Sequence, residues 1–198
     1  GWNPGTTQEI FSLPELVEAF SFDRVNKAGA KFDPDKTKWF NQQYLRKKSD
    51  EELEVLFSEI LKEKGITGFD SQFVQKVCHL SKEKAHFVSE FWTNGTYFFI
   101  APTAYDADVL KKRLNEKTAE FIKQLTASFE SLNNFNSQET EATFKLVAEK
   151  LALGAGQVMQ LFRVSITGVG GGPALFEIVE LLGKEEILKR LNAFLKTV

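Results

Sequence analysis

One stretch near the end of the chain combines residue types that bind polar or charged ligands. Residues 163–183 read RVSITGVGGGPALFEIVELLG, so a glycine cluster is followed by a proline that can open a helix. Gln160, Arg163 and Thr167 precede the cluster at i, i+3 and i+7, the spacing of one helical face. A glycine loop ahead of a helix is also the arrangement that cradles phosphates. The stretch therefore predicts either a nucleotide site or a polar surface presented to another partner.

The apolar spacing before the glycines argues against the nucleotide site. Val158, Leu161, Phe162 and Ile166 follow helical spacing, whereas a dinucleotide cradle follows a strand. The 26 residues after Gly172 contain no predicted second strand, and no Gly-Lys-Ser/Thr sequence closes the loop. We therefore interpret the glycines as a connection between two helices.

The polar stripe before the glycine loop suits an unstacked nucleic-acid base. An arginine stacks on such a base or hydrogen-bonds its edge, and the amides of a helix N-terminus bind anionic or polar groups. The alternative is that Arg163 is an ordinary surface residue and that the glycines only form a tight turn. These residues alone leave both interpretations open.

No arrangement of residues predicts catalysis or metal binding. His79 and His86 are seven residues apart, and Cys78 lies on the apolar stripe of a predicted helix, a spacing that matches no common zinc signature. A Ser/His/Asp set finds no local support either. We expect a core cysteine, two surface histidines, no catalytic residue and no metal ion.

Charge is distributed unevenly along the chain, although the net charge is only −2. Residues 23–48 contain eight Lys or Arg against three Asp, and residues 49–80 contain three Lys against seven acidic residues. The basic segment predicts contact with backbone phosphates. Ordinary solvated helix faces are the alternative.

Composition indicates a globular, intracellular protein. The chain has 198 residues, 42% of them hydrophobic, and its 19 phenylalanines can form a substantial core. No apolar run reaches the ~18–20 residues of a membrane span, and the N-terminal residues do not resemble a secretory signal. A single cysteine suits a reducing compartment. We expect a cytoplasmic protein that does not bind a membrane.

Helical periodicity and capping residues predict an all-α fold, a multi-helix array. Ser12–Glu15 and Ser49–Glu52 are capping boxes, and Asp33 precedes a proline at a helix start. The later helices are expected to begin near Asp70, Ser81, Asp106, Ser137, Gly156 and Pro173 and after Gly183, with 94–105 as a buried connector. The helix from Asp106 is expected to run without interruption through Phe129.

Four long segments resemble the bacterial glutamyl-tRNA synthetase family, a class I aminoacyl-tRNA synthetase. They read GWNPG, EIFSLPELVEAFSFDRVNKAGAKFDPDKTKWFNQQYL, GQVMQLFRVSITG and PALFEIVELLGKEEILKRL. The resemblance covers nearly the whole chain and is weaker between about 50 and 150. It implies the end of a stem-contact fold over 1–47, a first helical anticodon-binding domain over 48–100 and a second over 101–198.

The resemblance assigns one set of residues to the anticodon. In LSKEKAHFVSEF, Lys84 stands where the family often carries an arginine that reads the third anticodon base, and a lysine lacks that planar fork. Side chains often stand where this chain has Gly170–Gly172, so contacts there would pass through the backbone. The expected anticodon-facing residues are Lys84, Gln160, Arg163, Thr167, Gly172, Pro173 and Leu175.

A second set is expected to contact the stem and inner corner of the tRNA, or to support those contacts. The segment TKWFNQQY matches the family's helix on that side, with Trp39 and Tyr44 also candidates for the core. The expected residues are Lys36, Trp39, Asn41, Gln42, Tyr44, Arg46 and Lys47.

The resemblance also implies what the chain does and does not do. The catalytic domain of the family, with its His-Ile-Gly-His-type and Lys-Met-Ser-Lys-type motifs, lies upstream, and neither motif occurs here. We expect a monomeric, noncatalytic fragment that binds tRNA(Glu) without a cofactor, whereas the full-length enzyme charges that tRNA with glutamate using ATP and magnesium. The rival hypothesis is a helical protein-interaction module that binds no RNA.

Overall fold

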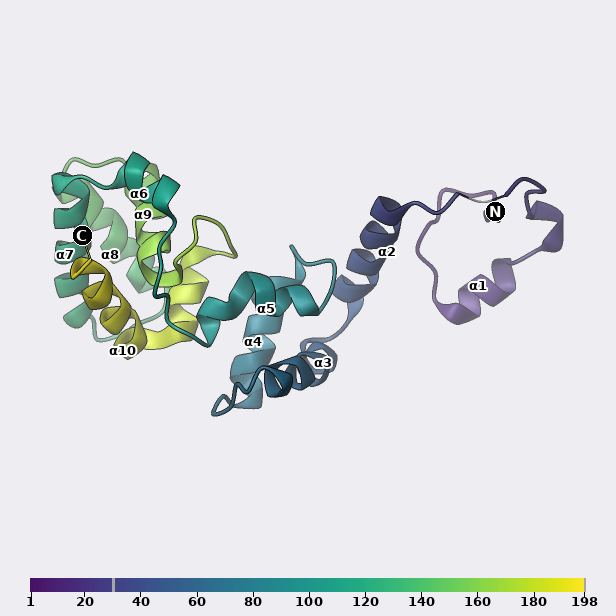
Figure 1. Ribbon diagram of the computed structural model, residues 1–198, viewed down its shortest axis with the longest axis horizontal. Helices are drawn as coiled ribbons and strands as arrows, with labels where there is room; N and C mark the ends of the chain where they lie inside the picture. The colour runs from purple at the N-terminus through teal and green to yellow at the C-terminus, as the bar shows by residue number, and fades with distance from the viewer. Residues whose placement is uncertain (30, 198) are drawn as a thin grey trace.

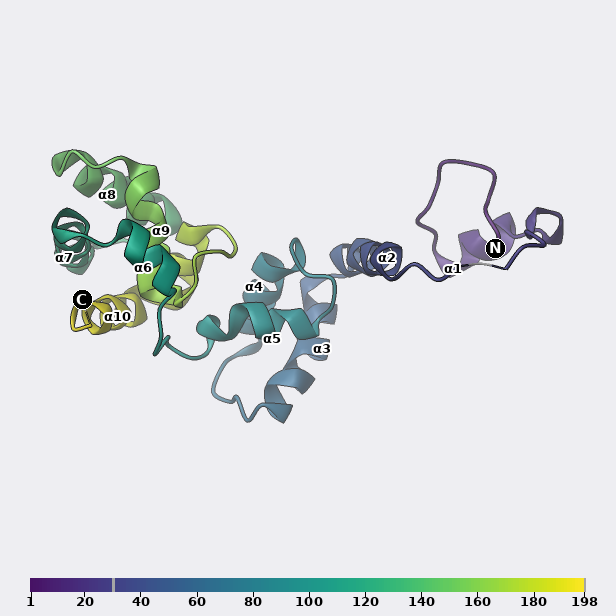
Figure 2. The same cartoon turned by 45° about the horizontal axis from the view of Figure 1, so that its top comes forward.

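The computed structural model describes residues 1–29 and 31–197, and the chain forms an elongated array of helices. Figures 1 and 2 show an N-terminal segment at one end, a group of helices in the middle and a larger group at the other end. Within the described residues every named element is an α-helix or a short 3-10 helix, and Trp2 and Val25 form an isolated bridge. The predicted all-α fold class is confirmed.

The N-terminal segment contains α1 (Leu13–Ala19) and the 3-10 helix η1 (Phe22–Arg24). The predicted capping box is present, because the Ser12 side chain accepts from Glu15 N and Glu15 accepts from Ser12 N. Leu13 and Val17 of α1 are 74% and 70% exposed, so the apolar stripe of this helix faces solvent.

The middle group begins with α2 (Pro34–Lys47), which Asp33 caps by accepting from Asp35 N and Lys36 N. It continues with α3 (Asp50–Glu63), α4 (Ser71–Lys82), α5 (Ser89–Gly95) and the 3-10 helix η2 (Thr96–Phe98). The capping box at Ser49 and the cap at Asp70 are confirmed. Their apolar faces enclose one core, which centres on Phe57, Val77 and Phe91.

The predicted helix start at Ser81 is wrong. Ser81 lies in the last turn of α4, and α5 begins only at Ser89. Side chains of α2 explain the irregular segment between them, because Asn41 Nδ2 and Arg46 Nη2 donate to the carbonyls of His86 and Glu83. These carbonyls bond to another helix instead of continuing a helical ladder, a tertiary contact that local capping rules do not predict.

The larger group consists of α6 (Ala107–Arg113), α7 (Glu116–Glu130), α8 (Ser137–Lys150), α9 (Ala155–Thr167) and α10 (Leu175–Leu195). Their apolar faces enclose a second core in which Phe121, Phe129, Phe144 and Phe162 are fully buried. Edge-to-face and tilted contacts between these rings, at centroid distances of 5.1–5.9 Å, are the favoured aromatic geometries.

The expected uninterrupted helix from Asp106 to Phe129 is two helices. Asn115 accepts from Thr118 N at 3.1 Å, and Thr118 Oγ1 accepts from Asn115 N at 2.8 Å, so a new capping box begins α7. Apolar residues continue with helical spacing across this break, and periodicity alone therefore did not show it.

The segment before the glycine cluster is helical, as predicted. It forms α9, which ends at Gly168 in the left-handed conformation with φ 81°, and Gly168 N donates to Val164 O at 2.8 Å. Gly183, with φ 77°, interrupts α10 at the position where a helix break was expected. Ile178 of α10 packs into the core of the middle group, so α10 connects the two cores.

The described residues can also be compared with the requirements of a membrane span and of a metal site. Within residues 1–29 and 31–197 no helix is both long and apolar enough to cross a membrane. The same residues contain no group of three or more His, Cys, Asp or Glu placed to hold a metal ion. Cys78 is fully buried, and His79 Nδ1 lies 2.9 Å from Asp50 Oδ2 at the surface.

Burial of Cys78 predicts that the fold loses stability at alkaline pH. Desolvation, aided by Asp50 and Glu54, raises the pKa of the thiol from 9.0 to about 12. Between these values the unfolded chain releases a proton that the folded chain keeps, so the free energy of unfolding falls as pH rises. In the wild type, ionisation of this thiol should lower the free energy of unfolding by up to about 1.4 kcal/mol per pH unit, and Cys78→Ala should abolish this contribution. Urea unfolding from pH 8 to 11 measures both curves.

Val77→Ala is the matched control, since Val77 is also fully buried but does not titrate. Its cost should stay constant with pH. If the Cys78→Ala and wild-type stability curves run parallel above pH 9, the thiol does not ionise in the way that its burial predicts.

Candidate nucleic-acid interface

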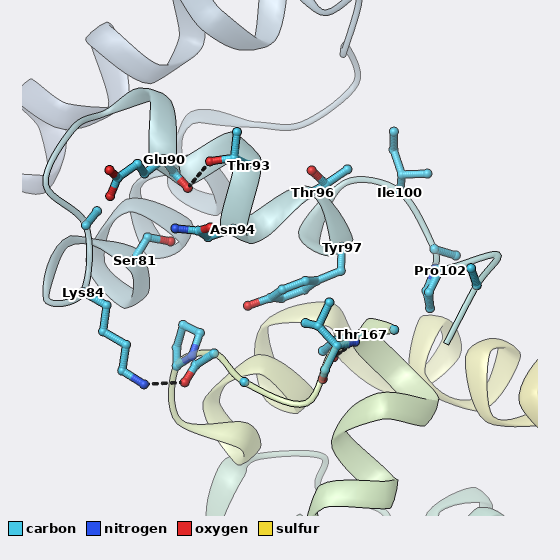
Figure 3. Close-up of a pocket in the computed structure, with 18 of the residues that line it drawn as sticks. Ser81, Lys84, Glu90, Thr93, Asn94, Thr96, Tyr97, Ile100, Pro102 and Thr167 are labelled. Atoms are coloured by element: carbon cyan, nitrogen blue, oxygen red, sulfur yellow. Dashed lines mark hydrogen bonds between the residues drawn. The ribbon is translucent and has the colours of Figure 1, made fainter. Parts of the chain in front are cut away.

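A cleft of about 600 Å³ separates the middle group of helices from the glycine loop after α9. Figure 3 shows side chains reaching into it from the α4–α5 region, from η2 and from the end of α9. Ser81, Lys84 and Tyr97 contribute from one side, and Thr167 and Pro173 contribute from the other. Residues about 90 positions apart in the chain therefore line one surface.

Lys84 and the glycine loop are in direct contact, although the sequence assigned them to the anticodon from two distant segments. Lys84 Nζ donates a hydrogen bond of 2.7 Å to the carbonyl of Gly172 (Figure 3). This bond closes one end of the cleft and joins the two helical groups. Because the ammonium has three donor hydrogens, it can bind a further acceptor while it holds this carbonyl.

Arg163 lies half-buried on α9 behind the same loop. Its Nη1 is shielded from solvent and has no hydrogen-bond partner among the residues that the structure describes. Burial lowers the pKa of its guanidinium, which keeps its charge at neutral pH. Arg163 therefore holds an unused charged donor beside the cleft.

Tyr97 is a member of the cleft that sequence reasoning missed. Its side chain is 5% exposed, and its Oη finds no partner within the described part of the chain. Burial raises the pKa of the phenol to about 12, so the hydroxyl remains protonated at neutral pH. In the sequence Tyr97 stands in an aromatic run that reads as core, and no local signal distinguishes it.

Gly172 makes the close approach of loop, arginine and tyrosine possible. A Cβ at this position would lie 3.0 Å from Tyr97 Oη and 3.1 Å from Arg163 Nη1, and the residue has φ 143°. A side chain here would be strained and would press on both polar groups. The glycine is therefore required by geometry at this point.

Gln160 and Thr167 shape the neighbouring surface. Gln160 Oε1 accepts from Arg113 Nε at 3.2 Å, so Arg113 of α6 extends the polar stripe of α9. Thr167 is 3% exposed, and its Oγ1 donates to Arg163 O at 2.8 Å and accepts from Val169 N at 3.3 Å. Thr167 thus holds the start of the loop.

Pro173 and Leu175 take different positions at the other end of the loop. Pro173 lines the cleft, whereas Leu175 is only 4% exposed and packs in the core of the larger group. The anticodon-facing role of both residues stays a prediction, and for Leu175 the structure shows a packing role.

A buried arginine connects the two walls of the cleft. Arg190 of α10 is 3% exposed, and its Nη1 donates to Tyr97 O at 2.7 Å and to Ile166 O at 2.9 Å. Its Nε pairs with Glu186 Oε1 at 2.7 Å. Sequence reasoning missed this residue, although a charge among Ile187, Leu191 and Phe194 on one helix was a usable signal.

The stem-contact set divides into two groups, the first of which supports the fold. Asn41 and Arg46 donate to the carbonyls of His86 and Glu83, and Gln42 Nε2 donates to Glu83 O at 3.4 Å. Arg46 Nε also lies 3.3 Å from Glu83 Oε2. These side chains attach α2 to the loop that carries Lys84.

The second group faces solvent. Trp39 and Tyr44 are 39% and 43% exposed rather than in the core, and Tyr44 Oη donates to Phe11 O at 2.7 Å. Lys36 Nζ pairs with Glu9 Oε1 at 2.9 Å, and Lys47 is exposed. Contact of this surface with RNA stays a prediction.

Comparison with known proteins identifies the type of fold. Residues 51–195 match the family model described as an anticodon binding domain. The chain is 48% identical to a glutamate–tRNA ligase of Flavobacterium psychrophilum and 43% identical to one of Phocaeicola vulgatus, and covers 100% and 97% of its own length in the two alignments. It spans only 39% and 38% of these relatives.

Two solved structures resemble the chain closely. A glutamate tRNA ligase from Elizabethkingia meningosepticum, solved in complex with its amino acid, superposes with a TM-score of 0.92 at 36% identity, over 100% of this chain and 39% of that one. The enzyme from Elizabethkingia anophelis gives 0.89 at 34% identity, over 99% and 38%.

Fold and cleft together define an all-α anticodon-binding protein. The chain belongs to the anticodon-binding domain family, in the form that bacterial glutamate–tRNA ligases contain.

The buried position of Arg190 predicts a large effect of its removal. Arg190→Met would leave the carbonyls of Tyr97 and Ile166 without their donor and Glu186 with only the exposed Lys189 at 3.7 Å, at a cost of about 3 kcal/mol. Urea unfolding measures this loss. Lys189→Met is the control, because that side chain is 73% exposed and should change stability by less than about 0.5 kcal/mol. Equal stabilities of the two variants would contradict the assigned role.

Proposed function

We propose that the chain is the tRNA-binding part of a glutamate–tRNA ligase and recognises the anticodon and inner corner of tRNA(Glu). The observation that carries this proposal is the cleft in which Lys84 meets the glycine loop, with Arg163 directly behind that loop. It lies in a chain that matches such ligases over its whole length. The ligand is an RNA base that has left its stack, which an unpaired arginine donor can bind.

We propose a division of labour along the chain. Residues 1–47 form the end of a stem-contact fold, 48–100 a first anticodon-binding domain and 101–198 a second. Two separate hydrophobic cores support the boundary near residue 100. The contact of Ile178 with the first core supports a fixed mutual position of the two domains during recognition.

In the proposed complex, bases of the anticodon enter the cleft between the two domains. Arg163 stacks on or hydrogen-bonds one base, and the Gly170–Gly172 loop contacts others through its backbone. Lys84 approaches the third base as a single cation, and its Nζ bond to Gly172 O couples this contact to the position of the loop. Lysine makes no forked contact, so third-base selection is weaker than an arginine would make it.

Catalysis belongs to the remainder of the proposed full-length enzyme, which would attach glutamate to its tRNA using ATP and magnesium in the cytoplasm. The chain covers about two fifths of its relatives and contains neither catalytic sequence motif of the family. We propose that it binds tRNA as a monomer without a cofactor. The family match disfavours the rival interaction module.

Arg163→Ala tests the proposed base contact. The variant should lose about 1–3 kcal/mol of binding to tRNA(Glu), because an arginine contact to a base is removed. A changed anticodon should weaken tRNA binding to Arg163→Ala less than it weakens tRNA binding to the wild type. Fluorescence titration with the two transcripts measures both effects.

Lys145→Ala is the control for lost positive charge, because Lys145 lies on α8 outside the cleft and its side chain is 60% exposed. It should bind as the wild type does. Binding that barely changes between 50 and 200 mM salt would contradict an RNA interface, which releases counterions from several phosphates.

The isolated chain should not charge tRNA. Supplied with glutamate, ATP, magnesium and tRNA(Glu), it should form no aminoacyl-tRNA above a reaction without protein. A full-length ligase of a relative serves as the positive control. Charging by the isolated chain would contradict the proposed division of labour.

A further inference from the structure

Two buried hydrogen-bond donors converge on one point behind the glycine loop. Tyr97 Oη and Arg163 Nη1 lie 3.0 Å and 3.1 Å from the position that a Cβ of Gly172 would take. Neither atom is exposed to solvent, and neither has a hydrogen-bond partner in the described part of the chain. They come from different helical groups, Tyr97 from η2 and Arg163 from α9.

An unpaired buried donor is costly, and two at one point indicate a missing acceptor. Burial of such a group without a partner typically costs about 1–3 kcal/mol, so most buried polar groups in proteins are paired. Glu90, the carboxylate among the residues that line the cleft, accepts from His86 N at 2.8 Å. Figure 3 shows the Tyr97 hydroxyl directed into the cleft.

We propose that Tyr97 is a specificity-determining residue, which together with Arg163 donates hydrogen bonds to one proton-free acceptor atom of an unstacked anticodon base. This inference rests on the proposed function. The acceptor is a carbonyl oxygen or an unprotonated ring nitrogen, because the guanidinium can only donate and the hydroxyl can donate to the same atom. An exocyclic amino group of a base would meet the Arg163 guanidinium, which can only donate, and would find only the phenol oxygen as an acceptor, which is how the pair favours an acceptor atom.

A base fits this position better than a phosphate. The cleft is lined by Ile100, Pro102 and Pro173 next to Tyr97, surfaces that favour a flat, partly apolar ring. One of the two donors is a neutral hydroxyl, which the raised pKa of Tyr97 keeps protonated. A phosphate is better served by exposed cations such as Lys84.

Access to the two donors requires movement of the glycine loop. In the structure this loop covers them, and the Lys84 bond to Gly172 O holds it in place. Release of this bond lets the loop lift, and the entering base then takes the position beside the donors. Lys84 becomes free to contact RNA in the same step.

Tyr97→Phe removes the hydroxyl and keeps the ring, and it is the direct test. Binding to tRNA(Glu) should weaken about tenfold, the effect of one lost hydrogen bond in a buried site. The penalty for a change of the contacted anticodon base, found by changing each of the three in turn, should fall by a similar factor. The ratio of wild-type to variant affinity should be equal at 50 and 200 mM salt, because no phosphate contact is lost.

Tyr105→Phe is the matched control. Tyr105 is half-buried in the same connector but packs edge-to-face on Phe194 and does not line the cleft. It should bind tRNA(Glu) and each transcript with a changed anticodon base as the wild type does. Thermal unfolding of each variant, followed by circular dichroism, confirms that the comparison is made between folded proteins.

A second pair of variants tests the same point from the loop. Gly172→Ala would press a methyl group on both donors only while the loop is closed, so it should favour the lifted loop and bind tRNA(Glu) at least as tightly as the wild type does. Gly156→Ala is its control, because Gly156 lies on α9 outside the cleft and the added carbon would have no described neighbour within 4 Å apart from the adjacent helix backbone. That variant should bind normally.

The outcomes separate this inference from the proposed function. Equal tRNA binding and equal anticodon preference in wild type and Tyr97→Phe overturn the inference. So does a Tyr97→Phe effect that shrinks with salt, which would indicate a phosphate contact. A wild-type chain without any anticodon preference would instead contradict the proposed function.

Discussion

The arrangement of the cleft depends on a single buried cation. Arg190 donates from one nitrogen to the carbonyl of Tyr97 and to that of Ile166, residues that lie 93 and 24 positions away. The first carbonyl belongs to the connector between the helical groups and the second to the end of α9. A buried charge is stable only with such partners, so the three segments hold one geometry. Asp106 N, which donates to Gly168 O at 2.9 Å, secures the same junction.

Around this junction, Tyr97 belongs both to the core of the middle group and to the lining of the cleft. Aromatic side chains fill the two cores, and the polar groups that face the cleft come from helix ends and loops. Gly172 allows backbone to lie directly against Tyr97 and Arg163, which any side chain would prevent. The glycine loop therefore contributes shape and backbone groups, and the rigid helices behind it contribute the side-chain donors.

Local sequence signals predicted the helices and one polar face, because capping boxes and apolar spacing act over a few residues. The helical character of residues 155–167, the breaks at Gly168 and Gly183, and the stripe of Gln160 and Arg163 followed from such signals. The break at Asn115 did not, because apolar spacing continues across it.

Tyr97 and Arg190 were missed since their roles depend on partners brought close only by the fold. Asn41 and Arg46 were expected to contact the RNA or to support such contacts, and their donors bond to the carbonyls of His86 and Glu83, respectively.

In the proposed complex, bound tRNA places its anticodon in the cleft beside α9. Hydroxyl-radical footprinting of tRNA(Glu) bound to the chain tests it most directly, because it maps contacts at single nucleotides. We expect protection of the anticodon loop, with further protection along the inner corner that faces α2. Protection confined to the acceptor end, or none at concentrations that saturate binding, would contradict it.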